Sequence, residues 1–500
     1  MLHLRSSDDI VQGRGLRILL AYVFVTAVVL LPCFWQPHVE SADYPSRLYN
    51  AWLAQRIIAE PVPGLELVSP WTNVLTDLIL GRMVDSGRFA GEAMMPAAAV
   101  SVFFWGAFSW IRVATGRSPW ALAPILAMLS YGVIFHFGFF NHYVSTALSL
   151  WILALLWRST LSKAVVAMGL AGLAWLAHPL PLFWGVAVLA YVYVGRRLSR
   201  ERRNWLLVAA LAVLVVIRSA LVFLFESRSV WNVESGVGIV LGMLGTDQFW
   251  VFGGKYAVIA VSVSLVAVSL VWRKFHRGDA EYLDLWFLHG AAFLAIPSAI
   301  QFPQYQHVLA FISERISLFG SLMLCLALSN TAFGKRAMTS SLVIAAVFFS
   351  FLYVDSASYN RVEAEVTELV RTLPPGQRVV GPIYDQAARV PALVHVVDRA
   401  CLGHCLSYGD YEPATGQFRV RVRGANQLVA WRMTDIQAIE EGEYVVKALE
   451  DPIYAVCACE PLGPKLCLRR ISEGRKTCST TLEITPRWWQ REGVDVRETR

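Results

Sequence analysis

Apolar segments recur between residues 16 and 354, separated by short polar or charged stretches. Most of them approach the roughly 20 residues that a helix needs to cross the hydrocarbon core of a bilayer. Hydrophobic residues make up 56% of the 500 residues and charged residues only 16%, against about 25% charged in soluble globular proteins. The pattern therefore excludes a soluble or disordered chain and predicts an α-helical polytopic membrane protein with about eleven transmembrane helices. The predicted spans are 16–34, 93–111, 119–137, 141–157, 164–177, 181–195, 205–225, 256–272, 284–300, 316–333 and 338–354.

Two pairs of these segments are short and poorly separated. One pair meets around residues 137–141 and the other around residues 177–181. These segments are either full membrane spans, or else short hairpins or broken helices.

The distribution of charge predicts the orientation of the chain in the membrane. Residues 1–354 carry a net charge of +8 and residues 355–500 a net charge of −1, which together give the +7 of the whole chain. If the N-terminus is cytoplasmic, 17 of the 25 basic residues before residue 355 lie in the inner loops. Cytoplasmic loops are enriched in Lys and Arg, so this orientation is favoured, and an odd number of spans then places residues 355–500 outside the cytoplasm. A positive excess confined to the membrane part argues against a nucleic-acid partner.

Residues 355–500 have the composition of a small soluble domain, and six of the eight cysteines lie there. An even number of cysteines in a compact stretch predicts disulfides in an oxidising compartment, although six cysteines allow 15 pairings. The alternative is a zinc site built from Cys401, His404 and Cys405 with two later cysteines, for which the spacing is irregular. The disulfide candidates are Cys401, Cys405, Cys457, Cys459, Cys467 and Cys478.

The same region is predicted to be a small α+β or mostly β domain, which divides the chain into a transmembrane domain, 1–354, and an extracytoplasmic domain, 355–500. A helical pattern at 359–373 ends at a Pro-Pro-Gly turn, and alternation of apolar and polar residues indicates strands after it. The predicted strands are 378–381, 392–397, 418–423, 443–448, 465–470 and 480–484.

The predicted first outer loop, residues 35–92, is long enough to carry a function of its own. Asp43 can cap a helix that has Pro45 in its first turn. The residues that follow are amphipathic, which predicts a helix at the outer surface of the membrane.

Three stretches resemble polytopic glycosyltransferases of the GT-C type, and in particular uncharacterised bacterial relatives with a DYP-x-H-L segment. They are DYPSRLYNAWLA (43–54), FGFFNHYVSTALSLWILAL (137–155) and WLAHPLPLFW (175–184). Residues 395–422 are also similar to the C-terminal domains of those relatives. The sequence departs from them at Arg47, where they often have His.

This resemblance implies a multi-pass protein of the bacterial inner membrane with a periplasmic C-terminal domain. Its substrates would be a sugar linked to a polyprenyl phosphate, which stays in contact with membrane lipid, and an acceptor hydroxyl outside the cytoplasm. A carboxylate would remove the proton of the acceptor, while cations or a divalent metal such as Mg or Mn would stabilise the departing phosphate. No protein partner is implied.

Asp43 is the candidate catalytic base, and the competing interpretation is a helix N-cap. Glu40 is a candidate to join Asp43 around a metal ion. Arg47 follows Asp43 by four residues, so it is expected either to form an ion pair with Asp43 along the helix or to bind phosphate.

Four further residues are candidates for binding the substrate or its phosphate. His142 and His178 lie at breaks between apolar segments, where ionisable groups often face a cavity, and the competing explanation is exposure at the membrane boundary. Arg228 lies in the outer loop 226–255. Arg315 begins the tenth predicted span from outside and either holds a lipid phosphate or extends to the interface.

The sequence is compatible with two functions. One is the glycosyltransferase, and the alternative is a non-catalytic envelope assembly or transport protein whose C-terminal domain binds a partner. The departure from the DYP-x-H-L segment at Arg47 favours the non-catalytic protein, whereas the long first outer loop favours the glycosyltransferase. The glycosyltransferase function predicts that Asp43 faces a cavity together with Arg315, Arg228 or a histidine.

Overall fold

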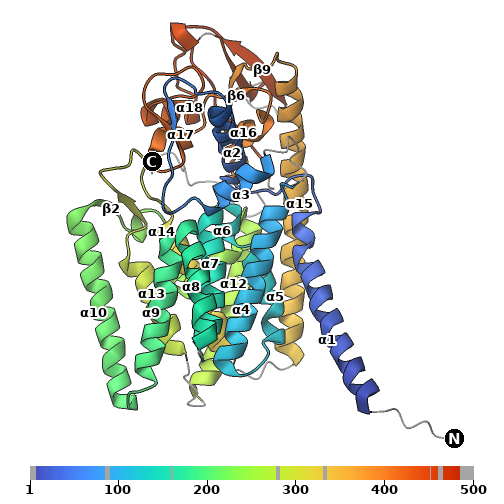
Figure 1. The fold of residues 1–500 in the computed structure, drawn as a ribbon, viewed down its shortest axis with the longest axis vertical. Coiled ribbons are helices and arrows are strands. Elements are labelled where there is room, and N and C mark those ends of the chain that lie inside the picture. The colour runs from blue at the N-terminus through green and yellow to red at the C-terminus, as the bar shows by residue number, and fades with distance from the viewer. Residues whose placement is uncertain are drawn as a thin grey trace, which may run out of the picture.

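The computed structural model consists mostly of helices, which form a bundle of apolar helices with a smaller sheet-containing part at one end (Figure 1). Each of the eleven predicted apolar segments overlaps at least one helix. The residues that the structure describes are 7–84, 91–158, 161–276, 282–329, 335–450, 452–459 and 465–484. The helices of the bundle are α1 (Ser7–Leu30), α4 (Met94–Thr115), α5 (Ala123–Ser130), α6 (Val133–His136), α7 (Phe140–Leu156), α8 (Leu161–Ala177), α9 (Pro179–Gly195), α10 (Arg200–Leu224), α11 (Gly236–Leu244), α12 (Gly254–His276), α13 (Leu283–Ala295), α14 (Ile312–Leu328) and α15 (Lys335–Arg371).

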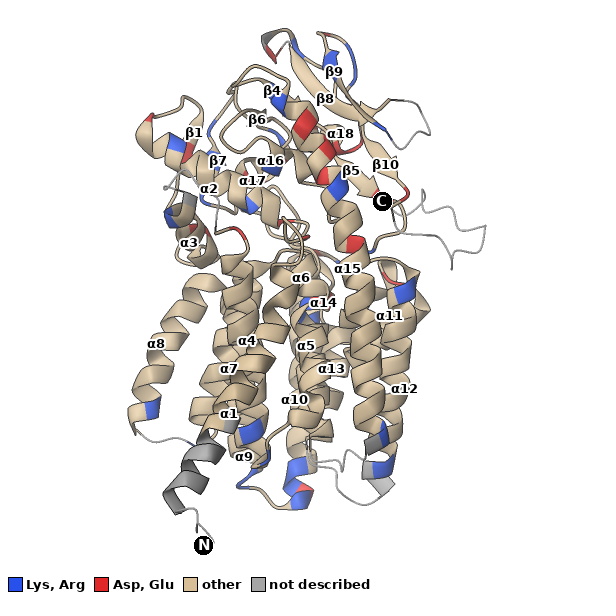
Figure 2. Ribbon diagram, turned by 90° about the vertical axis from the view of Figure 1, so that its right-hand side faces the viewer, with Lys and Arg blue, Asp and Glu red and all other residues tan. Residues whose placement is uncertain are grey.

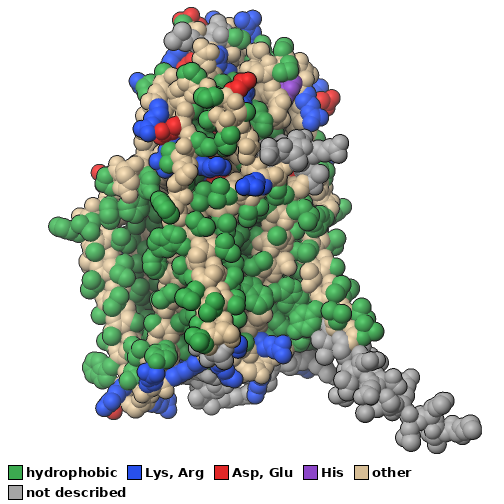
Figure 3. All heavy atoms as spheres, viewed as in Figure 1, with side chains coloured by type: hydrophobic (Ala, Val, Ile, Leu, Met, Phe, Trp, Pro, Cys, Tyr) green, Lys and Arg blue, Asp and Glu red, His purple; other side chains and the backbone are tan. Residues whose placement is uncertain are grey.

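The surface of the bundle is apolar. Apolar side chains cover the helices in Figure 3, while Lys and Arg gather at the end of the bundle that is remote from the sheets (Figures 2 and 3). Within the described residues, four helices are long and apolar enough to cross a membrane, and α10 among them has no buried residue. A helix that is apolar on all sides and exposed needs an apolar surrounding, as lipid provides. The four spans are Met94–Thr115, Arg200–Leu224, Gly254–Arg273 and Arg336–Arg371.

Of the four segments in the two closely spaced pairs, one is a broken helix and the other three are single helices of 17 residues. The predicted span 119–137 is a short 3₁₀ turn followed by α5 and α6, and α7 starts only three residues after α6 ends. The chain also breaks between α8 and α9 at His178, which caps α9 by accepting a hydrogen bond from Leu180 N–H at 3.2 Å. Pro179 follows at the first position of α9, where its missing N–H costs nothing.

The predicted boundary between residues 354 and 355 falls inside α15. This helix has 37 residues and runs without interruption from the bundle to the sheet-containing part (Figure 1). The apolar run 338–354 and the helical pattern 359–373 therefore belong to one element. We refer to residues 372–484 as the C-terminal region.

A four-stranded sheet in the order β6-β4-β8-β9 organises the C-terminal region. Strand β4 pairs in parallel with β6 and β8, and β8 pairs antiparallel with β9. The predicted strand at 392–397 is wrong, because its last two residues begin helix α16 (Val396–Ala400). The strands of this region are β4 (Arg378–Val380), β5 (Ile383–Asp385), β6 (Leu406–Ser407), β7 (Val420–Val422), β8 (Ile453–Ala458), β9 (Leu466–Ile471) and β10 (Thr480–Leu482), with helices α17 (Glu412–Thr415) and α18 (Met433–Glu440).

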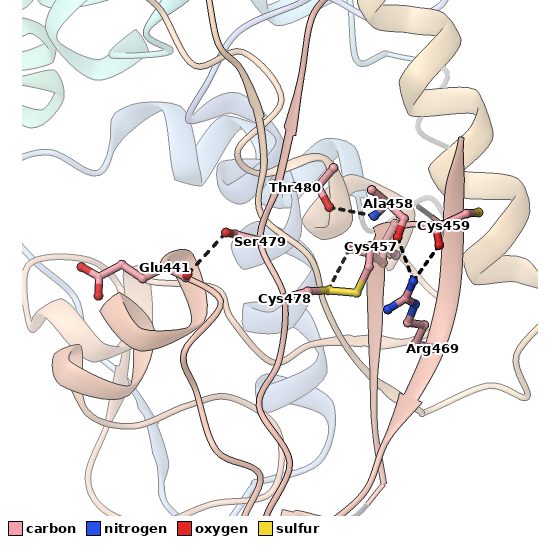
Figure 4. The surroundings of a disulfide bond; sticks show 9 residues. Glu441, Cys457, Ala458, Cys459, Arg469, Cys478, Ser479 and Thr480 are labelled. Carbon is pink, nitrogen blue, oxygen red and sulfur yellow. Dashed lines mark hydrogen bonds between the residues drawn. A yellow bond between two sulfur atoms is a disulfide. The ribbon is translucent and has the colours of Figure 1, made fainter. Parts of the chain in front are cut away.

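All six candidate cysteines form disulfides, so the zinc interpretation is wrong. The pairs are Cys401–Cys405, Cys457–Cys478 and Cys459–Cys467. The second pair joins β8 to the segment that leads into β10 (Figure 4). Cys33 and Cys325 are free and buried, as expected for apolar fillers.

The first outer loop packs against the C-terminal region and not against the membrane surface alone. Its helix α2 (Tyr44–Ala59) is largely buried, and α3 (Leu75–Val84) lies beside it. Strand β1 (Leu65–Leu67) pairs antiparallel with β7. The prediction of an amphipathic helix lying on the membrane is therefore wrong, since protein covers α2 on all sides over residues 44–51.

Candidate functional site

A cavity of about 350 Å³ lies where the bundle, the first outer loop and the C-terminal region meet. Five of the seven residues singled out in the sequence line it, although they come from four separate parts of the chain. The lining residues that carry polar or aromatic chemistry are Asp43, Arg47, Asn73, Phe137, Phe139, Asn141, His142, His178, His307, Phe311, Arg315, Tyr384, His395, Tyr411, Gln417, Phe418 and Glu440.

Asp43 stands at the start of α2 without capping it. The side chain makes no cap hydrogen bond, and it has no hydrogen bond or ion pair to any of the described residues. The N-cap interpretation is therefore wrong, and the carboxylate lines the cavity. A carboxylate that is not engaged in the fold is free to accept a proton from a bound molecule.

The backbone around Asp43 is fixed to the bundle. Asp43 N–H donates to the carbonyl of Phe137 at 3.1 Å, and Ala42 N–H donates to that of His136 at 2.8 Å. Gly138 lies directly beside this contact with φ of +80°, and a Cβ there would come within 2.8 Å of the Asp43 nitrogen. Residues 136–138, at the end of α6 and directly after it, therefore hold the carboxylate-bearing turn in place.

Arg47 does not pair with Asp43. Its guanidinium is 3.3 Å from Asp77 Oδ1 and 3.2 Å from Glu412 Oε1, and it lies 4.4 Å from the centre of the Phe418 ring. Burial raises the pKa of Glu412 well above its ordinary value although Arg47 opposes this. Arg47 thus joins α2, α3 and α17 at the wall of the cavity, and the expected i,i+4 ion pair is absent.

Arg315 is a buried cation without a partner. It is 9% exposed, lines the cavity, and has no carboxylate within ion-pair distance among the described residues. The guanidinium carbon lies 4.5 Å from the centre of the Phe139 ring, and Nε has no hydrogen-bond partner. A buried charge of this kind costs several kcal/mol unless an anion compensates it, so the side chain is suited to a negatively charged ligand.

His142 and His178 lie together near Arg315. Their ring centroids are 5.2 Å apart, and neither nitrogen of the His142 ring has a hydrogen-bond partner in the described structure. His178 uses Nδ1 to cap α9, which leaves Nε2 as the ring nitrogen that carries a proton. The two imidazoles and Arg315 offer hydrogen-bond donors to one part of the cavity.

Glu40 and Arg228 lie elsewhere. Glu40 is buried and accepts a hydrogen bond from Asn360 Nδ2 at 2.6 Å, and burial together with the charge of Glu363 raises its pKa well above the ordinary value. Arg228 lies in strand β2 (Glu226–Arg228), which pairs with β3 (Ala299–Gln301), and its side chain is exposed. Neither residue lines the cavity.

The donor set does not fit a divalent metal. Glu40 points into a separate buried cluster, so it does not join Asp43 as expected. No group of three or more His, Cys, Asp or Glu side chains in the described ranges is arranged to hold a metal ion. The chemistry of the site is therefore derived from the side chains alone.

Sequence reasoning missed the residues that the C-terminal region contributes, above all His395 and Tyr411. Their rings stack with centroids 5.1 Å apart, and His307 from the loop before α14 lies 5.9 Å from Tyr411. The resemblance at residues 395–422 covers both His395 and Tyr411. Nothing local in the sequence marks them as site residues, however, because they reach the cavity only through contact with the first outer loop, which is far away in the sequence.

Comparison of the chain with protein-family models, with curated proteins and with solved structures finds no match.

Proposed function

We propose that the protein is an integral membrane glycosyltransferase that transfers a sugar from a polyprenyl-phosphate donor to an acceptor hydroxyl outside the cytoplasm. The observation that carries the proposal is that one cavity holds a carboxylate, Asp43, and a buried cation, Arg315, neither of which has an ion-pair partner among the described residues. Transfer from a lipid phosphate needs a base for the acceptor and a cation for the leaving group.

The side chains divide the reaction between them. Asp43 takes the proton of the acceptor hydroxyl, the acceptor oxygen forms a bond to the anomeric carbon, and the bond from that carbon to the phosphate oxygen breaks. The electron pair leaves with the polyprenyl phosphate, whose charge Arg315 compensates with His142 and His178 as additional donors. The packing of Phe137 and Phe139 against Phe311 gives the cavity an apolar side next to these donors.

The position of the cavity supports the location that we propose, the inner membrane of a bacterium with the C-terminal region in the periplasm. Residues of the first outer loop and of the C-terminal region line the cavity. These parts lie at the end of the bundle opposite the cluster of Lys and Arg (Figure 2), which is the end expected to be outside the cytoplasm. Three disulfides at the same end agree with an oxidising compartment. A donor whose tail stays in the bilayer reaches such a site without leaving the membrane.

Replacing Arg315 by Gln is expected to lower kcat/KM for a polyprenyl-phosphate sugar roughly ten- to a hundredfold, because charge-assisted bonds to the phosphate are lost. Transfer of radiolabelled sugar by the solubilised protein measures the effect. Arg228→Gln is the matched control, since Arg228 is an exposed arginine outside the cavity. If the two variants are equally active, Arg315 does not bind the phosphate of the substrate.

A strain that lacks the protein tests the function itself. We expect it to lose a sugar from a surface glycan and to accumulate the corresponding polyprenyl-linked sugar, both of which mass spectrometry of lipid extracts and purified glycans detects. Unchanged glycans and unchanged lipid intermediates would favour the alternative, a non-catalytic envelope assembly or transport protein.

A further inference from the structure

His395 has the geometry of an oriented and charged imidazole at the wall of the cavity. Its Nδ1 lies 2.9 Å from Asp398 Oδ2, and Asp398 Oδ1 accepts a hydrogen bond from the hydroxyl of Ser407. The ring is 9% exposed and lines the cavity, and Nε2 has no hydrogen-bond partner among the residues described. One nitrogen is therefore committed to the fold, and the other is available to a ligand.

The surroundings of His395 keep it protonated. Burial disfavours the charged ring, but the hydrogen bond and the charge of Asp398, with smaller contributions from Asp43 and Asp410, raise the pKa to about 9. Tyr411, which stacks on the ring, stays neutral, because burial raises the pKa of its hydroxyl well above the ordinary value. An imidazolium of this kind donates from Nε2 and pairs best with an anionic oxygen.

Hydrogen bonds fix His395 relative to the helix that begins at Asp43. Ser407, which bonds Asp398, donates its backbone N–H to the hydroxyl of Tyr49 on α2 at 3.0 Å. Ser46 and Asn50, one turn apart on α2, donate to the carboxylate of Asp410 at 2.8 and 2.7 Å. The polar contacts across this interface hold Asp43 and His395 at the same cavity.

We infer that His395, positioned by Asp398, binds a phosphate oxygen of the substrate through Nε2, so that the C-terminal region forms part of the site. The inference rests on the proposed function for the kind of substrate, whereas phosphate binding itself is measurable without any transfer. The phosphate belongs either to the lipid donor or to a phosphate-bearing acceptor, and these two sources share the chemistry that His395 recognises.

Calorimetric titration of the full-length protein in detergent distinguishes the sources, with farnesyl phosphate as one probe and glucose 6-phosphate, whose phosphate is not on the anomeric carbon, as the other. At neutral pH, His395→Gln is expected to bind at least one probe roughly ten- to a hundredfold more weakly than the wild type does. A loss with farnesyl phosphate alone assigns His395 to the lipid phosphate, and a loss with glucose 6-phosphate alone assigns it to the acceptor. Unchanged affinity for both probes would overturn the inference, as would a wild type that binds neither.

The pH profile separates a binding role from a merely structural one. Binding by the wild type should weaken as the pH rises through about 9, because the imidazolium is then lost. Asp398→Asn keeps the ring but removes the charge that holds its proton, so its midpoint should move down toward the ordinary value of about 6.5. A profile that is the same in the two proteins would count against the inference.

His404→Gln is the matched control, since this ring hydrogen-bonds the carbonyl of Leu373 at 3.0 Å and does not line the cavity. It should bind both probes as the wild type does. If phosphate binding depends on His395 but no sugar transfer is found, only the proposed function fails.

Discussion

Replacing Asp43 by Asn should lower the rate of sugar transfer roughly 10²- to 10⁴-fold while the protein still folds and inserts. The amide has nearly the shape of the carboxylate but cannot accept the proton of the acceptor hydroxyl. Because the Asp43 side chain makes no hydrogen bond or ion pair to the described residues, its replacement breaks no contact of the fold. Transfer of labelled sugar from a polyprenyl-phosphate donor by the purified protein measures the effect.

Asp435→Asn is the control for this experiment. Asp435 is also a partly exposed aspartate, but it pairs with Lys447 at 3.0 Å on the surface of the C-terminal region and does not line the cavity. This variant should transfer sugar at the wild-type rate. If Asp43→Asn keeps wild-type activity and both proteins melt at the same temperature, Asp43 is not the base.

Most helices of the bundle were predictable because a membrane span obeys a simple rule, although α11 lies in the predicted outer loop 226–255. A segment that crosses the hydrocarbon core must satisfy its backbone internally and present apolar side chains, so hydropathy alone locates it. The breaks near residues 137 and 178 weakened that signal, because Gly138 lies between α6 and α7 and Pro179 starts α9 directly after the break at His178, both within apolar runs. The sequence left these two places open, and each of them contributes residues to the cavity.

The part of the site that comes from the C-terminal region could not be predicted in the same way. His395 lies where alternation of apolar residues suggested a strand, and its function as a cavity residue depends on the packing of α2 against β6 and α16. The wrong interpretation of α2 has the same origin. Ser46 and Asn50 are polar residues of this predicted amphipathic helix, but they bond the buried carboxylate of Asp410, whose pKa burial raises to about 7.

Glu40 was expected in the site, and it belongs instead to a buried cluster of three carboxylates around Arg399. The guanidinium contacts Glu363 on α15, lies 3.1 Å from Glu92 Oε1, and donates to the carbonyl of Val39 at 3.2 Å. The cluster joins the first outer loop, the start of α4, α15 and α16. Because the single cation Arg399 compensates the charge of three acidic groups, its loss should be the most destabilising single change in this part of the chain.

Replacing Arg399 by Met is expected to reduce the free energy of unfolding by about 3–5 kcal/mol, because it leaves buried carboxylates without compensation. Thermal unfolding in detergent, followed by circular dichroism, should show a lower apparent melting temperature than in the wild type. Arg361→Met is the control, since Arg361 is an exposed arginine on α15 and its loss should change stability by less than about 0.5 kcal/mol. Equal melting of the two variants would contradict this assignment.

The pH dependence of this loss follows from Glu92. Burial alone would raise the pKa of Glu92, but Arg399 and His38 hold it below the ordinary value. In the wild type the ionised carboxylate therefore stabilises the fold at neutral pH, and this stabilisation is lost as the pH falls through the lowered pKa. Without Arg399 that contribution is missing, so the deficit should be largest near neutrality and should shrink at acid pH, where the carboxylates are protonated. A double variant, Arg399→Met with Glu363→Met, should melt above Arg399→Met alone, because it removes one of the carboxylates that the single change leaves unpaired.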